Sequence, residues 1–185
     1  MKLVAIDFET ANNHPESACS IGITVFSEGE LTEEHCFLIK PNKEFNWFLK
    51  RNIEIHGISQ NMVENAEEWN EIYYKIQHLF SDAYIVAHNA SFDIAVFKSL
   101  NYLYHIPFKP FPYFCTVELS KKIYPRIKNH KLNTVCEYMG IELNHHEASS
   151  DARACALIVQ KSMMILGEYD IATFLKTSNV KTYIC

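Results

Sequence analysis

The sequence has few of the features that mark membrane, secreted or fibrous proteins. It contains no run of 18 or more apolar residues. Its N-terminus, MKLVAIDFET, lacks the basic region, long apolar core and cleavage site of a secretory signal. Glycine and proline are scarce, at 5 and 6 of 185 residues, and no internal repeat occurs. We therefore expect a cytoplasmic protein with no membrane partner, and the 48% apolar content predicts one compact domain.

Cysteine patterns are also missing. The 6 cysteines include no CxxC pair and no Cys/His finger spacing, and the interior ones have apolar sequence neighbours. Buried free thiols are therefore favoured over zinc ligands or disulfides.

Positive charge is scarce as well. Lysine and arginine total 17 against 22 acidic residues, for a formal charge of −5. This balance argues against tight non-specific binding to duplex nucleic acid, which depends on cation contacts to phosphates. It does not exclude a nucleic-acid enzyme whose acidic residues are neutralised by metal.

Apolar periodicity and turn residues predict a mixed α/β fold. Strands are expected near residues 2–9, 18–27, 31–40, 84–87 and 113–115. Residues 41–60 read as irregular and aromatic. Helices are expected at 65–80, from Ser91 past Leu100, at 116–123, at 131–139 before Gly140, and at 149–166. This order predicts a ribonuclease H-like architecture, with a central mixed five-stranded sheet flanked by helices on both faces.

Two carboxylates close the first expected strand. Asp7 and Glu9 follow the apolar run Leu3-Val4-Ala5-Ile6. Because side chains alternate along a strand, both carboxylates should lie on one face. Alone, an Asp-x-Glu pair is a weak signal, since it occurs by chance in many proteins.

Further acidic residues stand where helices are expected to begin. Asp93 in HNASFD and Asp151 in HEASSD would each lie in a first helical turn, where a carboxylate also suits the helix dipole. His146 precedes Asp151 and could be an ordinary surface histidine. Together the set is the equipment for binding two divalent metal ions and activating water against a phosphodiester.

These motifs, with IHGIS at 55–59, VAHNASFD at 86–93 and HKLNTVCEYMGI at 130–141, resemble the DEDDh 3′-5′ exonucleases. The likeness is to stand-alone bacterial members similar to the proofreading epsilon subunit of the replicative polymerase (the DnaQ-like superfamily). It covers residues 1 to about 166. We therefore expect an exonuclease domain at 1–167 and a short, weakly amphipathic tail at 168–185 that packs on the domain or contacts a partner.

The resemblance implies a role for each motif residue. Asp7, Glu9, Asp93 and Asp151 would hold two Mg²⁺ or Mn²⁺ ions, which carboxylate oxygens suit. His146 would be the general base, because its pKa lies near working pH. His145 is adjacent, but members of the family have four residues between this histidine and the aspartate, and that spacing selects His146. Residues expected to border the terminal nucleotide are Phe8, Thr10, Ala11, His56, Asn89 and Phe92; turn, cap or core packing roles are equally open for the last three.

Two further segments could contact the substrate. The basic stretch from Lys121 to Lys131 could follow strand phosphates, although a solvated helix end explains it equally well. Phe45, Trp47 and Phe48 could stack on bases, but core packing is the more common use of such aromatics.

The expected activity is metal-dependent release of nucleoside 5′-monophosphates from the 3′ end of single-stranded or frayed DNA, with a polymerase or repair partner. A 3′-5′ exoribonuclease of the same fold is the alternative. A third hypothesis is a non-catalytic nucleic-acid-binding or polymerase-scaffolding module. The four crowded carboxylates argue against it, because their mutual repulsion has no use without metal.

Overall fold

The computed structural model describes residues 2–185, which contain a mixed sheet with the strand order β3-β2-β1-β4-β5-β6. Its strands are β1 Lys2–Thr10, β2 Ala18–Ser27, β3 Glu30–Leu38, β4 Ala83–Ala87, β5 Pro112–Cys115 and β6 Tyr183–Ile184. β1, β4 and β5 are parallel, whereas β2, β3 and β6 run antiparallel to their neighbours. The expected ribonuclease H-like class is confirmed. The strand count was one too low, because β6 lies in the tail.

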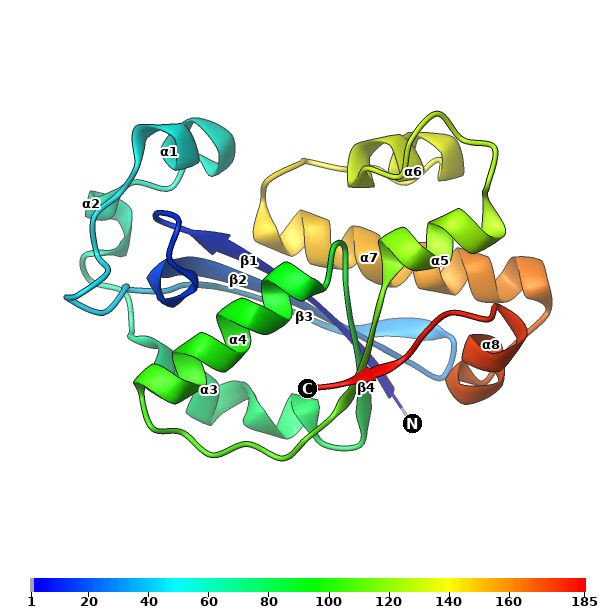
Figure 1. Cartoon of the computed structure of the whole chain (residues 1–185), viewed down its shortest axis with the longest axis horizontal. Helices are drawn as coiled ribbons and strands as arrows, with labels where there is room; N and C mark the ends of the chain where they lie inside the picture. Colours follow the sequence, from blue (N-terminus) through cyan, green and yellow to red (C-terminus); the bar gives the residue numbers. More distant parts are fainter. Residues whose placement is uncertain (1) are drawn as a thin grey trace.

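Helices cover both faces of this sheet (Figure 1). Those on one side include α3 Trp69–Ile76, the 3-10 turn η2 Gln77–Phe80 and α4 Ser91–Leu103. The other side carries α5 Thr116–Ile123, α6 Leu132–Met139, α7 Ala148–Leu166 and α8 Ile171–Thr177. The short elements η1 Pro15–Ser17, α1 Lys50–His56 and α2 Gln60–Val63 lie beyond the end of β1.

Two helical segments differ from expectation. The helix predicted at 65–80 starts only at Trp69, because Glu68 is its N-cap. The backbone N–H of Glu68 donates to the Glu71 carboxylate (3.1 Å). Residues 41–60, read as irregular, contain α1, which ends at the left-handed Gly57. Helix α1 has no buried residue, so its sequence carries no apolar periodicity from which it could be recognised.

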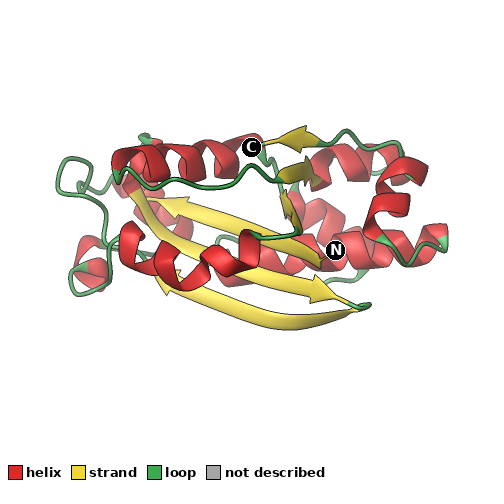
Figure 2. Ribbon diagram, turned by 90° about the horizontal axis from the view of Figure 1, so that it is seen from below, coloured by secondary structure: helices red, strands yellow, loops and turns green. Residues whose placement is uncertain are grey.

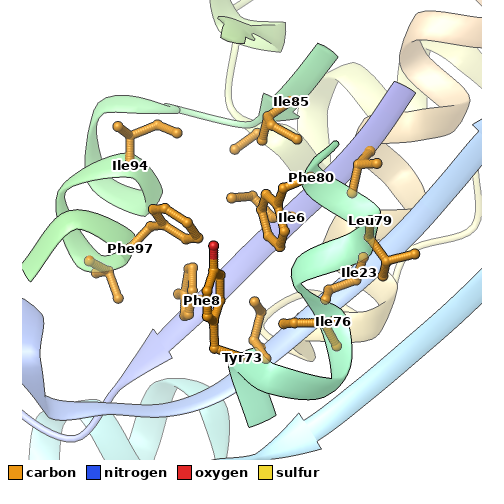
Figure 3. Packing of buried hydrophobic residues seen from close by; sticks show 14 of the residues in the cluster. Ile6, Phe8, Ile23, Tyr73, Ile76, Leu79, Phe80, Ile85, Ile94 and Phe97 are labelled. Atoms are coloured by element: carbon orange, nitrogen blue, oxygen red, sulfur yellow. The ribbon is translucent and has the colours of Figure 1, made fainter. Parts of the chain in front are cut away.

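The core on the α3–α4 side is strongly aromatic (Figure 3). Trp69 and Phe97 are fully buried, with ring centroids 6.0 Å apart, and Phe8 of β1 packs 5.6 Å from Trp69. Tyr73 and Phe80 extend the cluster. Burying such large rings stabilises a fold by several kcal/mol in total, about 1.5–3 kcal/mol for each side chain. The end of β1 is therefore held rigidly.

The tail is folded onto the domain. Ile171, Phe174, Leu175 and Val180 are buried in the core on the α7 side. Strand β6 pairs with β5, and the ring of Tyr183 stacks on Tyr113 at 5.3 Å. Figure 2 shows the C-terminus at this short edge of the sheet. Residues 171–184 thus add an edge strand and a helix to the architecture.

The cysteines are free among the described residues, as expected. Cys19, Cys136 and Cys155 are buried, but Cys36 is exposed, which corrects the expectation for that position. Cys36 lies on β3, an edge strand with solvent on one face. Within residues 2–185, no helix is long and apolar enough to cross a membrane.

Candidate active site

Three carboxylates meet where β1 ends and α7 begins. Asp7, Glu9 and Asp151 each place an oxygen within 4.8 Å of the others. Asp7 and Glu9 are two residues apart in β1, so their side chains share a face of the strand, as predicted. Asp151 lies in the first turn of α7. The predicted meeting of strand and helix carboxylates is therefore observed.

Gly22 allows the start of α7 to lie close to the sheet. It lies in β2 directly beside Asp7 in the strand register. A Cβ atom at this position would stand 2.0 Å from the carbonyl oxygen of Ala148 and 2.5 Å from the amide nitrogen of Ser149. The start of α7 therefore packs directly on the backbone of Gly22, and this contact brings Asp151 close to β1. Sequence reasoning missed Gly22, although a lone glycine inside a buried strand often marks such a close approach.

Asp93 adds a fourth carboxylate to this set from helix α4. It is 1% exposed in the first turn of α4, and its Oδ1 accepts a hydrogen bond from the Phe8 amide (3.0 Å). The chain enters α4 through Asn89, whose left-handed φ of 67° reverses the backbone after β4. We call Asp7, Glu9, Asp93 and Asp151 the acidic floor.

Burial and crowding oppose ionisation of the acidic floor. Burial, then the charges of Asp93 and Asp151, raise the pKa of Asp7 well above its usual range. The same causes raise the pKa of Glu9 to about 8. Burial likewise raises the pKa values of Asp93 and Asp151. Such a cluster is stable in its charged form only with a counter-charge.

The donor set fits hard divalent cations. Oδ1 of Asp151 is buried and has no hydrogen-bond partner among residues 2–185. A buried acceptor of this kind is costly unless something binds it. Carboxylate oxygens are the ligands that Mg²⁺ and Mn²⁺ prefer. The floor residues therefore suit metal binding chemically as well as by position.

Two stacked histidines cover Asp151. The rings of His145 and His146 lie 3.8 Å apart at 16°. Nδ1 of His145 donates to Asp151 Oδ2 (2.9 Å), and the His146 amide donates to the same oxygen (3.2 Å). Burial, followed by the neighbouring His145, lowers the pKa of His146. His146 lies on the turn before α7, as expected, but its neighbour makes the side-chain contact to Asp151.

Asp7, Glu9, Asp151 and the two histidines line one open cleft of about 870 Å³, whereas the buried Asp93 is not among its lining residues. This volume accommodates a nucleotide-sized ligand. The basic stretch also reaches the cleft, but through only part of its length. The lining residues outside the acidic floor and the histidine pair include His88, Asn89, Phe92, Lys121, His130 and Lys131. His130 belongs to the basic stretch that the sequence indicates as a possible substrate contact, whereas the sequence assigns no role to His88.

Three of the residues expected to contact the nucleotide are buried, and three are more exposed. The Phe8 side chain is in the aromatic core (Figure 3), so its amide contact to Asp93 is its link to the site. Ala11 is buried against Cys19 and Ile58. Thr10 is 7% exposed and borders a second hollow beside the main cleft.

The other three expected contacts are less buried. His56 donates from Nε2 to the Thr10 carbonyl (3.2 Å) and accepts from the Ile58 amide at Nδ1 (3.0 Å), so turn chemistry occupies both nitrogens. Asn89 lines the cleft, and its carbonyl accepts from the Phe92 amide. Phe92 is 43% exposed and borders both hollows, so core packing is excluded for its ring.

The aromatic stretch lies apart from the cleft lining. Phe45 and Trp47 pack around the His14 ring at centroid distances of 5.4 and 5.3 Å, and Trp47 is 44% exposed. The buried Asn12 side chain holds this segment through the Phe45 and Trp47 carbonyls. Phe48 packs against the small core around Ala11.

Comparison with known proteins places the chain in a family. The exonuclease family RNase_T matches residues 4–159. A PolC-type DNA polymerase III from Thermotoga petrophila is 29% identical over 185 residues, covering 98% of this chain and 13% of that protein. The 3′-5′ exonuclease DinG of Bacillus subtilis is 32% identical over 163 residues, covering 85% and 17%. The chain thus spans less than a fifth of these relatives' length.

Solved structures share the fold. Exonuclease X in complex with 5′ overhanging duplex DNA superposes with a TM-score of 0.74 at 22% identity, covering 95% of this chain and 99% of that one. A 3′-exonuclease that recognises a histone mRNA stem-loop gives 0.73 at 16% identity, covering 91% and 83%. With the profile match and the DxE, Asp93 and HxxxxD motifs in place, the chain belongs to the RNase_T exonuclease family, as a member of its DEDDh, DnaQ-like 3′-5′ exonucleases.

Proposed function

We propose that this protein hydrolyses single-stranded or frayed DNA from the 3′ end, releasing nucleoside 5′-monophosphates. The observation that carries the proposal is the acidic floor: Asp7, Glu9 and Asp151 converge within 4.8 Å inside an open cleft of about 870 Å³. A binding module would have no need for buried carboxylates that repel one another. Family membership and the DNA-bound fold relative point to the same chemistry.

The floor would hold the metal ions. Asp7, Glu9, Asp93 and Asp151 would bind two Mg²⁺ or Mn²⁺ ions, and the unpartnered Oδ1 of Asp151 is one oxygen available to them. When bound, such ions neutralise charge on the phosphodiester and lower the pKa of water. Without that positive charge, the raised pKa of Glu9 would leave the floor partly protonated at neutral pH.

His146 would remove the proton from the attacking water. Its lowered pKa keeps the imidazole neutral, and so able to accept a proton, at neutral pH. Its place on a turn outside α7 gives the ring access to the cleft. Asn89 and the exposed Phe92 ring would border the terminal nucleotide, with Thr10, Ala11 and the Phe8 backbone beneath it and His56 supporting Thr10.

A gel assay tests the proposal. A 5′-labelled single-stranded DNA and an RNA of matched sequence are incubated with Mg²⁺, Mn²⁺ or EDTA, using the wild type and Asp7→Ala. We expect a metal-dependent ladder that shortens from the 3′ end and is absent with Asp7→Ala. Unchanged cleavage by the variant would refute the site, and binding without shortening would favour the scaffold hypothesis.

An exoribonuclease remains the second candidate. The specific observation that favours it is the fold relative that recognises a histone mRNA stem-loop. The same assay separates the two, since faster shortening of the RNA would reassign the substrate. A polymerase or repair partner is part of the proposal, because the PolC-type relative carries the matching segment within a polymerase.

A further inference from the structure

A second group of cleft residues contains two lysines and a histidine. Lys121 lies in the last turn of α5, and His130 and Lys131 directly precede α6. All three line the same cleft as Asp7 and Glu9. We call Lys121, His130 and Lys131 the basic rim. It brings cations to one border of a cleft whose floor is acidic.

The rim lysines are available to an anion. Both are exposed, and within residues 2–185 neither side chain forms a salt bridge or hydrogen bond. Lysines along a groove are the usual means of following nucleic-acid phosphates.

A half-buried histidine anchors the rim. His88 lies in the turn between β4 and α4, the turn that leads to Asp93. Its Nε2 donates to the His130 carbonyl (3.0 Å), and its Nδ1 is 2.8 Å from the Thr116 hydroxyl at the start of α5. The His130 ring is held in turn by the Ser120 hydroxyl, 2.9 Å from Nδ1. One side chain thus joins the turn before Asp93 to both α5 and the rim.

The bonding leaves His88 no catalytic role. A carbonyl oxygen only accepts, so Nε2 carries the proton, and the Thr116 hydroxyl then donates to Nδ1. Burial lowers the pKa of His88 to about 4, which keeps the ring neutral. With both nitrogens engaged inside the protein, His88 can hold structure but has no free atom for substrate.

We propose that the basic rim binds the phosphates of the strand that leads to the acidic floor, and that His88 is the positioning residue that keeps the rim in place. The inference rests on the proposed function, because it assigns the path of that substrate. It accounts for why His88 reaches across to a loop carbonyl rather than to the floor.

The first test is binding, which does not depend on cleavage. The affinity of a labelled eight-nucleotide single strand is measured by fluorescence anisotropy in EDTA at several salt concentrations. For Lys121→Ala/Lys131→Ala, we expect at least tenfold weaker binding and a shallower salt dependence, by about 0.7 in log–log slope per lost contact. Lys122→Ala/Lys128→Ala removes the same charge from the same segment but outside the cleft lining, and should bind like the wild type.

The second test isolates His88. For His88→Ala, we expect a several-fold higher KM for an oligonucleotide, and a smaller change with the p-nitrophenyl ester of thymidine 5′-monophosphate, which is too short to reach the rim. Trypsin should cut the native variant faster after Arg126 or Lys128, because the loop is released. His88→Asn, which retains a donor, should recover part of the oligonucleotide KM.

The outcomes separate the two proposals. If the wild type binds the strand through the rim but cleaves nothing, the proposed function fails and the rim inference stands. Equal weakening by the control pair, or an unchanged salt slope for Lys121→Ala/Lys131→Ala, overturns the rim. Equal KM changes on both substrates with an unchanged tryptic rate overturn the role of His88.

Discussion

The acidic floor and the basic rim of the same cleft are built in opposite ways. Floor carboxylates lie on β1 and in the first turns of α4 and α7, where packing holds them and burial raises their pKa values. Rim lysines lie at exposed helix ends joined by a loop. Chemistry needs fixed geometry, whereas phosphate contacts tolerate movement. Changes in the floor should therefore abolish activity, and changes in the rim should weaken it by degrees.

The largest effect is expected from Asp151→Asn. This change removes one floor charge while keeping the side-chain shape, so cleavage should fall to the level of the EDTA control. Stability in EDTA should rise, because like-charge repulsion is relieved. Asp170→Asn, at the exposed N-cap of α8, is the matched control and should cleave normally. A melting temperature and a gel assay check both; normal cleavage by Asp151→Asn would remove it from the floor.

His146→Ala should be the next most severe. Loss of the general base should slow kcat by about 10²–10⁴-fold. Metal affinity, measured by calorimetry, should stay unchanged. His145→Ala is the companion variant, since its ring stacks on His146 and contacts Asp151. A larger kcat loss in that variant would move the base to His145, and loss of metal binding in His146→Ala would make His146 a ligand.

Gly22→Ala tests how the floor is assembled. The added methyl would meet the Ala148 carbonyl, so α7 must shift and carry Asp151 with it. We expect a loss of about 1–3 kcal/mol in unfolding free energy and about 10² in kcat from the misplacement. Gly29→Ala has open space around it and a φ of +92°, so it should cost stability without comparable loss of activity. Equal kcat values in the two variants would contradict this account.

The smallest effect is a pH dependence of stability. Folding raises the pKa of Glu9 from near 4.5 to about 8, so the folded state binds the extra proton. That stabilisation is complete below pH 4 and is lost as pH rises toward 8. In EDTA, the melting temperature should therefore fall between pH 5 and 8. Mg²⁺ should raise it most at the upper end; a metal effect independent of pH would count against the floor as its binding site.

The sequence allowed the floor to be predicted because its signals are local. Asp7 and Glu9 end an apolar strand, and Asp151 begins a helix, so short-range patterns suffice. Gly22 and His88 act through contacts with Ala148 and His130, which are remote in sequence. No periodicity records such contacts. Helix α1 was missed for a related reason, since it buries no side chain, and β6 is only two residues long.

The folded tail matters for anyone who cuts this domain for expression or fusion. A fragment ending at residue 159, where the family match ends, would lose α8, β6 and the last turns of α7. Strand β5 would become an unpaired edge, and the apolar surface under Ile171 and Phe174 would be open to water. Bare edges invite pairing with other chains. Aggregation of such a fragment would then result from the loss of α8 and β6, and would not indicate a defect in the active site.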